Sequence, residues 1–221
     1  MSLTPKEVRK LREAEQRRKA IIKIVRKLVR KGGVEEISLR KVAELAGYST
    51  TVVYALFQDK ATLITQAMDE DLLELTRVMR EAVQAAPPGW EQVRAMARAY
   101  VAFGLRHPDE YAFVFMQRRP HAPNTSARVR HGDPEQDPYA FARQVWSGLA
   151  DQGLVSATPA DIDLMAQLTW EAIHGHTARQ LVMGPDDVWV PMAEAQQHLD
   201  ALVDVLLIGI RQRFQPLPDG S

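Results

Sequence analysis

The chain has 221 residues, of which 46% are hydrophobic and 25% charged, with a formal net charge of zero. This composition is typical of a folded globular protein with a sizeable core and excludes a disordered or fibrous chain. Because cysteine is absent, disulfides, thiolate zinc sites and cysteine nucleophiles are excluded. The most apolar early stretch, residues 20–29, contains Lys23, Arg26 and Lys27 and predicts neither signal peptide nor membrane span. We therefore expect a cytoplasmic protein without a membrane partner.

The zero net charge conceals two segments of opposite sign. Residues 1–60 hold 15 Lys and Arg against 7 Asp and Glu, a balance of +8, so residues 61–221 carry −8. A basic segment joined to an acidic one indicates that only the first faces a polyanion. Charge alone leaves both nucleic acid and an anionic membrane surface open.

Helical spacing predicts a first helix over residues 13–31, which Gly32 and Gly33 end. Before it lies an N-terminal arm that is either disordered or a further contact to the polyanion. Its basic residues are Lys6, Arg9, Lys10 and Arg12.

A helix-turn-helix pattern follows the first helix. Ser38 can cap a short helix that begins at Leu39, and Gly47 supplies a left-handed backbone at its end. Ser49 or Thr50 can cap the next helix, which runs to Phe57, and Asp59 caps a long fourth helix. In the third helix Val53 and Phe57 share one side, which leaves the other faces for a partner.

The segment SLRKVAELAGYSTTVVYALFQDKATL, residues 38–63, resembles the DNA-binding signature of TetR-family transcription regulators in order and spacing. The resemblance implies an all-α protein of about nine helices. A helix-turn-helix DNA-binding domain with its basic arm would occupy residues 1–60. A helical effector-binding and dimerisation domain would occupy residues 61–221. The recognition helix, Ser49 to Phe57, would then enter the major groove of duplex DNA.

The resemblance also implies roles for individual residues. Tyr54 and Lys60 match positions that contact the DNA backbone, while Thr50 and Thr51 match positions that face bases. Arg40 is expected to reach a phosphate or a base edge, unless it is simply solvated. The full DNA-binding set is Ser38, Arg40, Ser49, Thr50, Thr51, Tyr54, Ala55 and Lys60.

The recognition helix departs from the family pattern because it has no Arg, Lys, Asn or Gln for a bidentate contact to a base. Thr51, Ala55 and Leu56 in this helix, and Tyr48 in the turn before it, are the other departures from the pattern. We therefore expect specificity to depend on thymine methyl groups, DNA shape, Arg40 and the basic arm.

The remainder of the chain is predicted to be helical and to carry a dimer interface. Helices are expected at about 60–85, 89–106, 108–118, 137–151, 160–183 and 191–213. The proline-rich segment 119–137 is expected to be a long exposed loop, with a lid as one alternative.

In TetR-family proteins the last two helices pair with those of a second subunit, which implies a homodimer. The apolar stripes of these two helices can alternatively be intramolecular core. The expected interface is Ile162, Met165, Leu168, Ala172, Leu199, Leu202, Leu206 and Ile210.

Residues 170–175, WEAIHG, further resemble the Trp-His-Gly signature of one group of TetR-like C-terminal domains. The functional interpretation is an apolar effector cavity; the alternative is a packed aromatic beside a core histidine. His174 and His176 lie two apart on a helix and so diverge, which argues against a metal site. The expected effector set is Tyr100, Phe103, Tyr111, Phe115, Trp170, His174 and Arg179.

No phosphate-binding glycine loop, nucleophile elbow or zinc-protease motif is present, so no catalytic residue, cofactor or metal is expected. The resemblance to TetR-family regulators implies a ligand-responsive repressor on a pseudo-palindromic operator. The alternative is a helical-bundle enzyme or interaction protein whose C-terminal domain carries the main activity.

Overall fold

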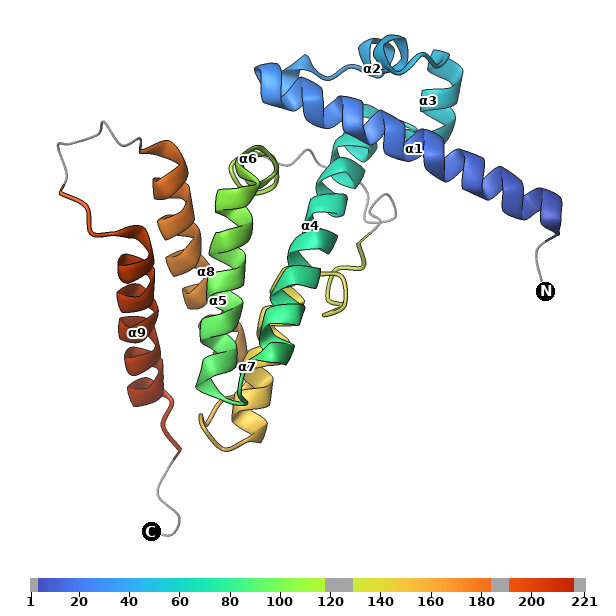
Figure 1. Cartoon of the computed structure of the whole chain (residues 1–221). Helices are drawn as coiled ribbons and strands as arrows, with labels where there is room; N and C mark the ends of the chain where they lie inside the picture. The colour runs from blue at the N-terminus through green and yellow to red at the C-terminus, as the bar shows by residue number, and fades with distance from the viewer. Residues whose placement is uncertain (1–3, 118–128, 184–190, 217–221) are drawn as a thin grey trace. The chain divides into compact units, whose positions relative to one another are not determined.

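The computed structural model describes residues 4–117, 129–183 and 191–216 (Figure 1). Within these ranges the secondary structure consists of nine α-helices and one short 3₁₀ helix, as the predicted all-α class requires. None of the helices in the described ranges has the length and apolar character needed to span a membrane. The described residues form two compact units, one of residues 4–71 and 109–117 and the other of the remainder.

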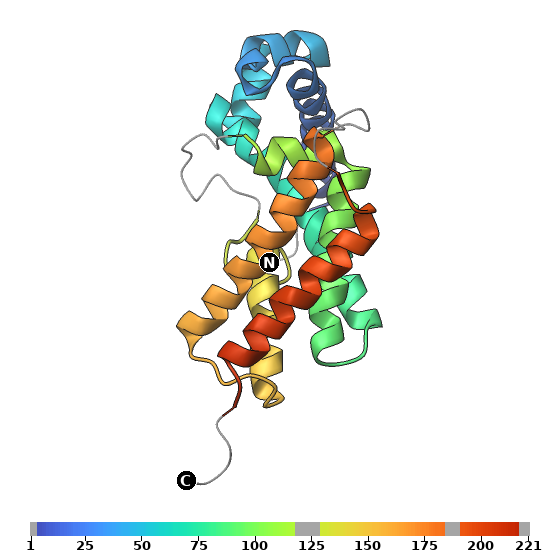
Figure 2. The same ribbon diagram turned by 90° about the vertical axis from the view of Figure 1, so that its left-hand side faces the viewer.

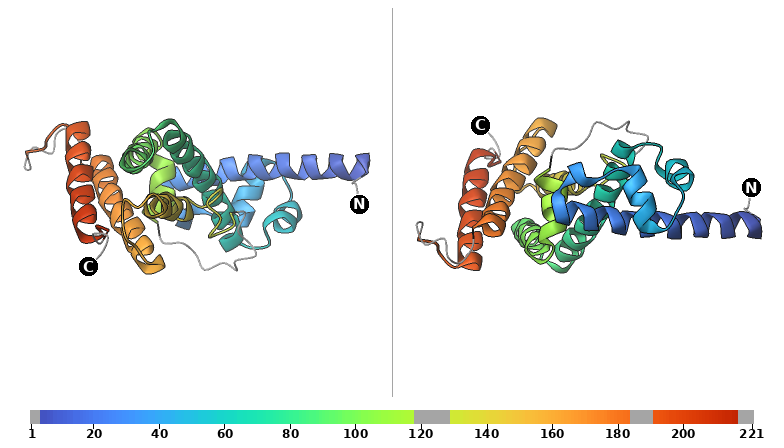
Figure 3. Two further views of the ribbon diagram at one scale, coloured as in Figure 1. Left: turned by 90° about the horizontal axis from the view of Figure 1, so that it is seen from below. Right: turned by 90° about the horizontal axis from the view of Figure 1, so that it is seen from above.

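The first helix of the first unit, α1 (Pro5–Gly32), begins eight residues earlier than the spacing predicted. The Thr4 hydroxyl accepts from the backbone N–H of Glu7, and the Glu7 carboxylate accepts from the backbone N–H of Thr4, 2.8 Å away. This reciprocal capping box satisfies two terminal donors and starts the helix. The expected arm is therefore the first turns of α1, which extend beyond α3 (Figure 3).

The first unit continues with the 3₁₀ helix (Val34–Glu36), α2 (Leu39–Ala46), α3 (Thr50–Phe57) and the start of α4 (Lys60–Ala85). Helix α1 packs against both α2 and α3. Apolar side chains from α1, α2, α3 and the start of α4 are fully buried and form one small core. They include Ile21, Val25, Val42, Val53, Phe57 and Leu63.

The second unit is a helical bundle built on the rest of α4, α5 (Trp90–Arg106), α7 (Pro138–Asp151), α8 (Pro159–Val182) and α9 (Ala195–Arg213). Helix α8 packs against α5, α7 and α9, and the views show α8 and α9 side by side (Figure 2). Trp146, Leu149 and Met165 are completely buried in its core.

Some predicted boundaries differ from the structure. Helix α6 (Pro108–Phe115) ends three residues before the expected 118, and α9 begins at Ala195 rather than at 191. Helix α6 belongs to the first unit from Asp109 onward, and α4 remains in that unit through Asp71, so the expected division after residue 60 falls within a compact unit. The assignment of DNA binding and effector binding to separate domains stays a prediction.

The predicted loop at 119–137 is described only from residue 129, and its part at 119–128 lies outside the described residues. The described part packs against α4 rather than projecting from the bundle. Thr76 donates to the carbonyl of Gln136 at 3.2 Å, and Arg80 donates to that of Pro134 at 3.1 Å. Arg80 also pairs with Glu135 at 2.9 Å. These hydrogen bonds fix residues 134–136 on the bundle.

Candidate nucleic-acid interface

The turn between α2 and α3 is built by local backbone chemistry, as the sequence predicted. The Ser38 hydroxyl accepts from the N–H of Lys41, and the Ser49 hydroxyl accepts from the N–H of Val52. Gly47 ends α2 at φ 70° and ψ 26°, in the left-handed region that glycine adopts without a Cβ clash. Both serines are therefore helix caps, and their hydroxyls hold the two helices in place.

Helix α3 has one buried side and one exposed side. Val53 and Phe57 are fully buried. Thr50, Thr51, Tyr54 and Ala55 are exposed, and Tyr54 shows 54% of its surface to solvent. A tyrosine this exposed contributes little to core packing, and its phenolic hydroxyl is suitable for contact with a phosphate.

The two basic members of the predicted set differ in exposure. Arg40 is exposed on α2, whereas Lys60 is half-buried at the first residue of α4. The neighbouring Lys41 forms an ion pair with Glu36, which partly neutralises it. Arg40 is therefore the cation of α2 that is more available to an anion.

Sequence reasoning missed Arg18 of α1, which holds the end of α3. Its guanidinium lies over the Phe57 ring at 4.9 Å from the centroid and donates to the carbonyl of Leu56 at 3.2 Å. A third contact reaches the side chain of Gln66 on α4. A cation at a helix C-terminus also interacts favourably with the helix dipole. Helical periodicity could not indicate this residue because its partners lie about 40 positions away.

Gln58 was also missed, and it is the only non-glycine residue with positive φ in the described part of the chain. It has φ 63° and ψ −54°, and across it the N–H of Asp59 donates to the carbonyl of Phe57 at 2.7 Å. This γ-turn is a strained way to join two helices. The turn sets the direction of α4 relative to α3.

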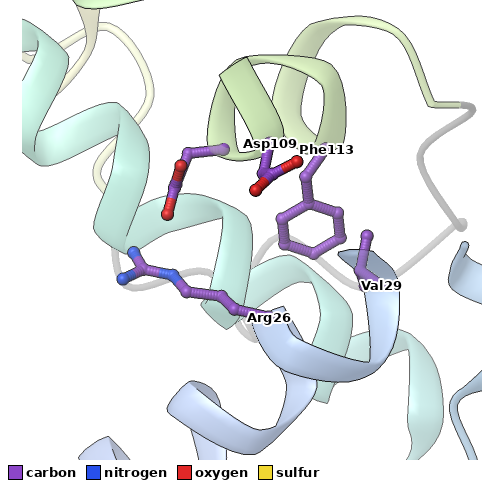
Figure 4. Close-up of a pocket in the computed structure, with 5 residues that line it drawn as sticks. Arg26, Val29, Asp109 and Phe113 are labelled. Atoms are coloured by element: carbon purple, nitrogen blue, oxygen red, sulfur yellow. The ribbon is translucent and has the colours of Figure 1, made fainter. Parts of the chain in front are cut away.

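A cluster of charges joins three helices of the same unit. Arg26 of α1 pairs with Asp71 of α4, and the small hollow beside Arg26 is also lined by Asp109 and Glu110 of α6 (Figure 4). Burial raises the pKa of Asp71 to about 7, Arg26 opposes the rise, and the Glu110 charge adds to it. One carboxylate oxygen of Asp71 is buried without a hydrogen-bond partner. The first unit therefore contains a carboxyl group, that of Asp71, which changes charge near neutral pH.

Three of the predicted effector residues lie together in the second unit. The indole N–H of Trp170 donates to the Tyr100 hydroxyl at 3.1 Å, and that hydroxyl lies 3.5 Å from His174 Nδ1. The Trp170 and His174 rings are 5.9 Å apart, as expected for residues one helical turn apart. Burial lowers the pKa of His174, so this ring is neutral around neutral pH.

The other four members of the effector set lie on α5, α6 and α8. Phe103 is buried on α5, where its ring lies 5.0 Å from that of His107. Tyr111 and Phe115 pack against each other on α6 of the first unit. Arg179 contacts His198 on α9 instead.

The predicted dimer residues divide into two sets. Ile162, Met165, Leu199 and Ile210 are buried within the second unit, whereas Leu168, Ala172, Leu202 and Leu206 are half-buried. The most exposed apolar side chains of α9 are two that were not predicted: Val205 at 71% and Ile208 at 66%.

Comparison with known proteins now places the chain in a family. A sequence model described as the tetracyclin repressor-like C-terminal domain matches residues 93–206, more than half of the chain. The chain belongs to the tetracyclin repressor-like (TetR) family. It is a TetR-family transcription regulator, as the recognition-helix signature predicted. The narrower Trp-His-Gly grouping stays a prediction.

Solved structures share the TetR fold over nearly the whole chain. A protein of unknown function from Rhodococcus sp. RHA1 is 21% identical with a TM-score of 0.68, covering 89% of this chain and 96% of its own. A proposed TetR family transcription regulator from Shewanella sp. PV-4 is 15% identical with a TM-score of 0.65, covering 91% and 99%. AibR, solved in complex with isovaleryl coenzyme A and operator DNA, is 17% identical with a TM-score of 0.55, covering 86% and 97%.

Proposed function

We propose that this TetR-family regulator is a repressor that occupies a pseudo-palindromic operator as a homodimer and leaves it when a small-molecule effector binds. The observation that carries the proposal is the two-sided recognition helix. Its buried side, Val53 and Phe57, fixes α3 on the core, while Thr50, Thr51 and Tyr54 are exposed. A fixed helix with an exposed polar side is suited to the major groove.

In this proposal Tyr54, Lys60 and Arg40 contact phosphates, and the two threonines face the bases. Each threonine offers a hydroxyl for hydrogen bonding and a methyl for contact with thymine. Ser38 and Ser49 act through their caps, so their loss is expected to weaken binding by loosening the helices rather than by removing a DNA contact.

The homodimer would use α8 and α9, because Val205 and Ile208 leave an apolar strip uncovered on α9. Large exposed apolar residues at one helical face favour an association surface. A two-fold dimer also presents two recognition helices to two half-sites.

The effector would bind beside Tyr100, Trp170 and His174, where aromatic surface adjoins three polar groups. AibR is solved with both isovaleryl coenzyme A and operator DNA, which is a precedent in the fold for a small molecule and an operator on one protein. Effector binding would shift the population of dimers away from the spacing that matches the operator. We propose a cytoplasmic location, beside the operator, and no enzymatic role.

The test is fluorescence anisotropy of the full chain on DNA from its own promoter region at several salt concentrations. The wild-type chain is expected to bind one segment selectively, with affinity that falls as salt rises. Tyr54→Ala and Lys60→Ala should each weaken binding by about tenfold, since each removes one contact worth roughly 1–2 kcal/mol. Arg106→Ala, a change of an exposed arginine in the second unit, is the matched control. Equal binding to all DNA sequences, or no effect of either variant, would overturn the proposal.

A further inference from the structure

An open hollow of about 520 Å³ lies between the end of α8 and the start of α9 in the second unit. Pro191, Met192 and Ala193 form part of its apolar wall. Arg179 of α8 and His198 of α9 supply polar groups to the same hollow. Neither Tyr100 nor Trp170 lines it, so it is separate from the proposed effector group.

Once their mutual hydrogen bond is made, Arg179 and His198 have only N–H donors left for a ligand in the hollow. A guanidinium nitrogen of Arg179 lies 3.1 Å from His198 Nδ1, and because arginine can only donate, the imidazole accepts there. His198 therefore carries its proton on Nε2. The other contact of Arg179 is to the sulfur of Met192, a weak acceptor. In the described ranges Arg179 has no carboxylate partner.

A buried histidine, His176, packs against the ring of His198. His176 is buried, its ring meets that of His198 edge to face at 5.3 Å, and its Nδ1 has no hydrogen-bond partner. Burial lowers the pKa of His176, and its electrostatic interactions with His198 and Arg179 lower it further. Two carboxylates lie at the start of α9: Glu194 accepts from the backbone N–H groups of Gln196 and Gln197 as the helix cap, and Asp200 accepts from Arg98 of α5. Both oxygens of Glu194 are thus engaged by the backbone of α9, and Arg179 is a cation at the hollow whose described contacts are to Met192 and His198.

We infer that this hollow is a ligand site for an aliphatic carboxylate, whose anionic group pairs with Arg179 and the Nε2–H of His198 while its chain covers the apolar wall. A guanidinium binds a carboxylate through two parallel hydrogen bonds, which are among the stronger polar contacts in proteins. Apolar walls with a few convergent polar groups are the usual form of a small-molecule site. The site adds a second ligand class to the proposed effector response.

The test is isothermal titration of the full chain with sodium octanoate, and with 1-octanol as the uncharged comparison. Octanoate is expected to bind saturably and 1-octanol at least tenfold more weakly, a difference of about 1.4 kcal/mol. Arg179→Met should weaken octanoate by at least tenfold. Arg106→Met, at an exposed arginine outside the hollow, should leave it unchanged. Equal binding of the two probes, or unchanged binding in Arg179→Met, would overturn the inference.

A second variant distinguishes loss of the binding site from loss of folding. Ala201 lines the hollow and is exposed, so Ala201→Trp fills the space without removing a charge or a core residue. It should abolish octanoate binding while the thermal unfolding midpoint stays unchanged. If the wild-type dimer shows no octanoate heat and Ala201→Trp is monomeric, a second copy of the chain occupies the hollow and the inference is wrong. Because DNA affinity is not part of this measurement, its outcome is distinguishable from failure of the proposed repressor function.

Discussion

The guanidinium of Arg18 lies over the ring of Phe57, 4.9 Å from its centroid, and joins α1 to the buried side of the recognition helix. The same guanidinium donates to the carbonyl of Leu56, so one side chain holds both the core side and the end of α3. Positioning of the recognition helix therefore depends on a residue that does not lie in the helix-turn-helix itself.

Arg18→Met is expected to destabilise the first unit by about 1–2 kcal/mol, because it removes a cation–π contact and a charge-assisted hydrogen bond while keeping an apolar chain. Urea unfolding followed by circular dichroism measures the loss. Arg17→Met changes the next, more exposed arginine, whose ion pair with Glu13 spans 3.8 Å, and should cost less than 0.5 kcal/mol. Equal losses in the two variants would contradict the positioning role.

The free energy of unfolding should carry a pH dependence from Asp71. Burial raises the pKa of this carboxyl to about 7 in the folded chain, well above its ordinary value of 3.8. The folded state therefore binds a proton that the unfolded state releases, so stability declines as the pH rises from 4 through 7. Relative to Asp71→Asn, the wild-type chain should lose up to about 1.4 kcal/mol per pH unit in this window.

Chemical unfolding at pH 5, 6, 7 and 8 checks the Asp71 prediction. Only the difference between wild type and Asp71→Asn is informative, because His174 and His176, whose pKa values are lowered by burial, contribute a slope of opposite sign near pH 6. Glu44→Gln, at an exposed carboxylate of α2, serves as the control. A constant difference across the four pH values would refute a buried, protonated Asp71.

Replacing Gln58 should stabilise the protein if the new residue accepts positive φ. Gln58→Gly is expected to gain about 1 kcal/mol, because glycine adopts φ 63° without a Cβ clash. Gln58→Ala keeps the Cβ and should gain nothing. Thermal unfolding of the two variants compares them directly, and equal midpoints would show that the turn is unstrained.

A charge on the exposed side of α9 should separate the proposed dimer. Val205→Asp and Ile208→Asp each place a carboxylate on a strongly exposed apolar position, so neither disturbs the core of the monomer. Sedimentation equilibrium is expected to show monomers, with operator affinity reduced by at least tenfold. Leu105→Asp, on an exposed leucine of α5, should remain dimeric. Dimers in both α9 variants would place the interface elsewhere.

Local signals in the sequence predicted the helix-turn-helix well. Ser38, Gly47 and Ser49 act within four residues of their own position, so spacing alone identifies their roles. The γ-turn at Gln58 was not predicted, because glutamine is not typical of positive φ. The link from Arg18 to Phe57 joins residues distant in sequence, which periodicity does not register.

Which side of α9 is buried could not be predicted from its sequence, for a different reason. Apolar residues occupy more than one side of this helix, so several stripes fit helical spacing equally well. Packing against α8 and α5 buries Leu199, Val203 and Leu207 and leaves Val205 and Ile208 outside. Burial within the bundle, which the sequence does not reveal, distinguishes the two sides.

The capping box at Thr4 limits how the basic start of α1 can approach DNA. While these residues are helical, the rod with its side chains is about 10–12 Å across, whereas the minor groove of B-DNA is about 6 Å wide. The helix therefore cannot enter that groove as an extended arm does. We expect Lys6 and Lys10, one turn apart on it, to present two ammonium groups at a fixed interval along the outside of the phosphate backbone instead.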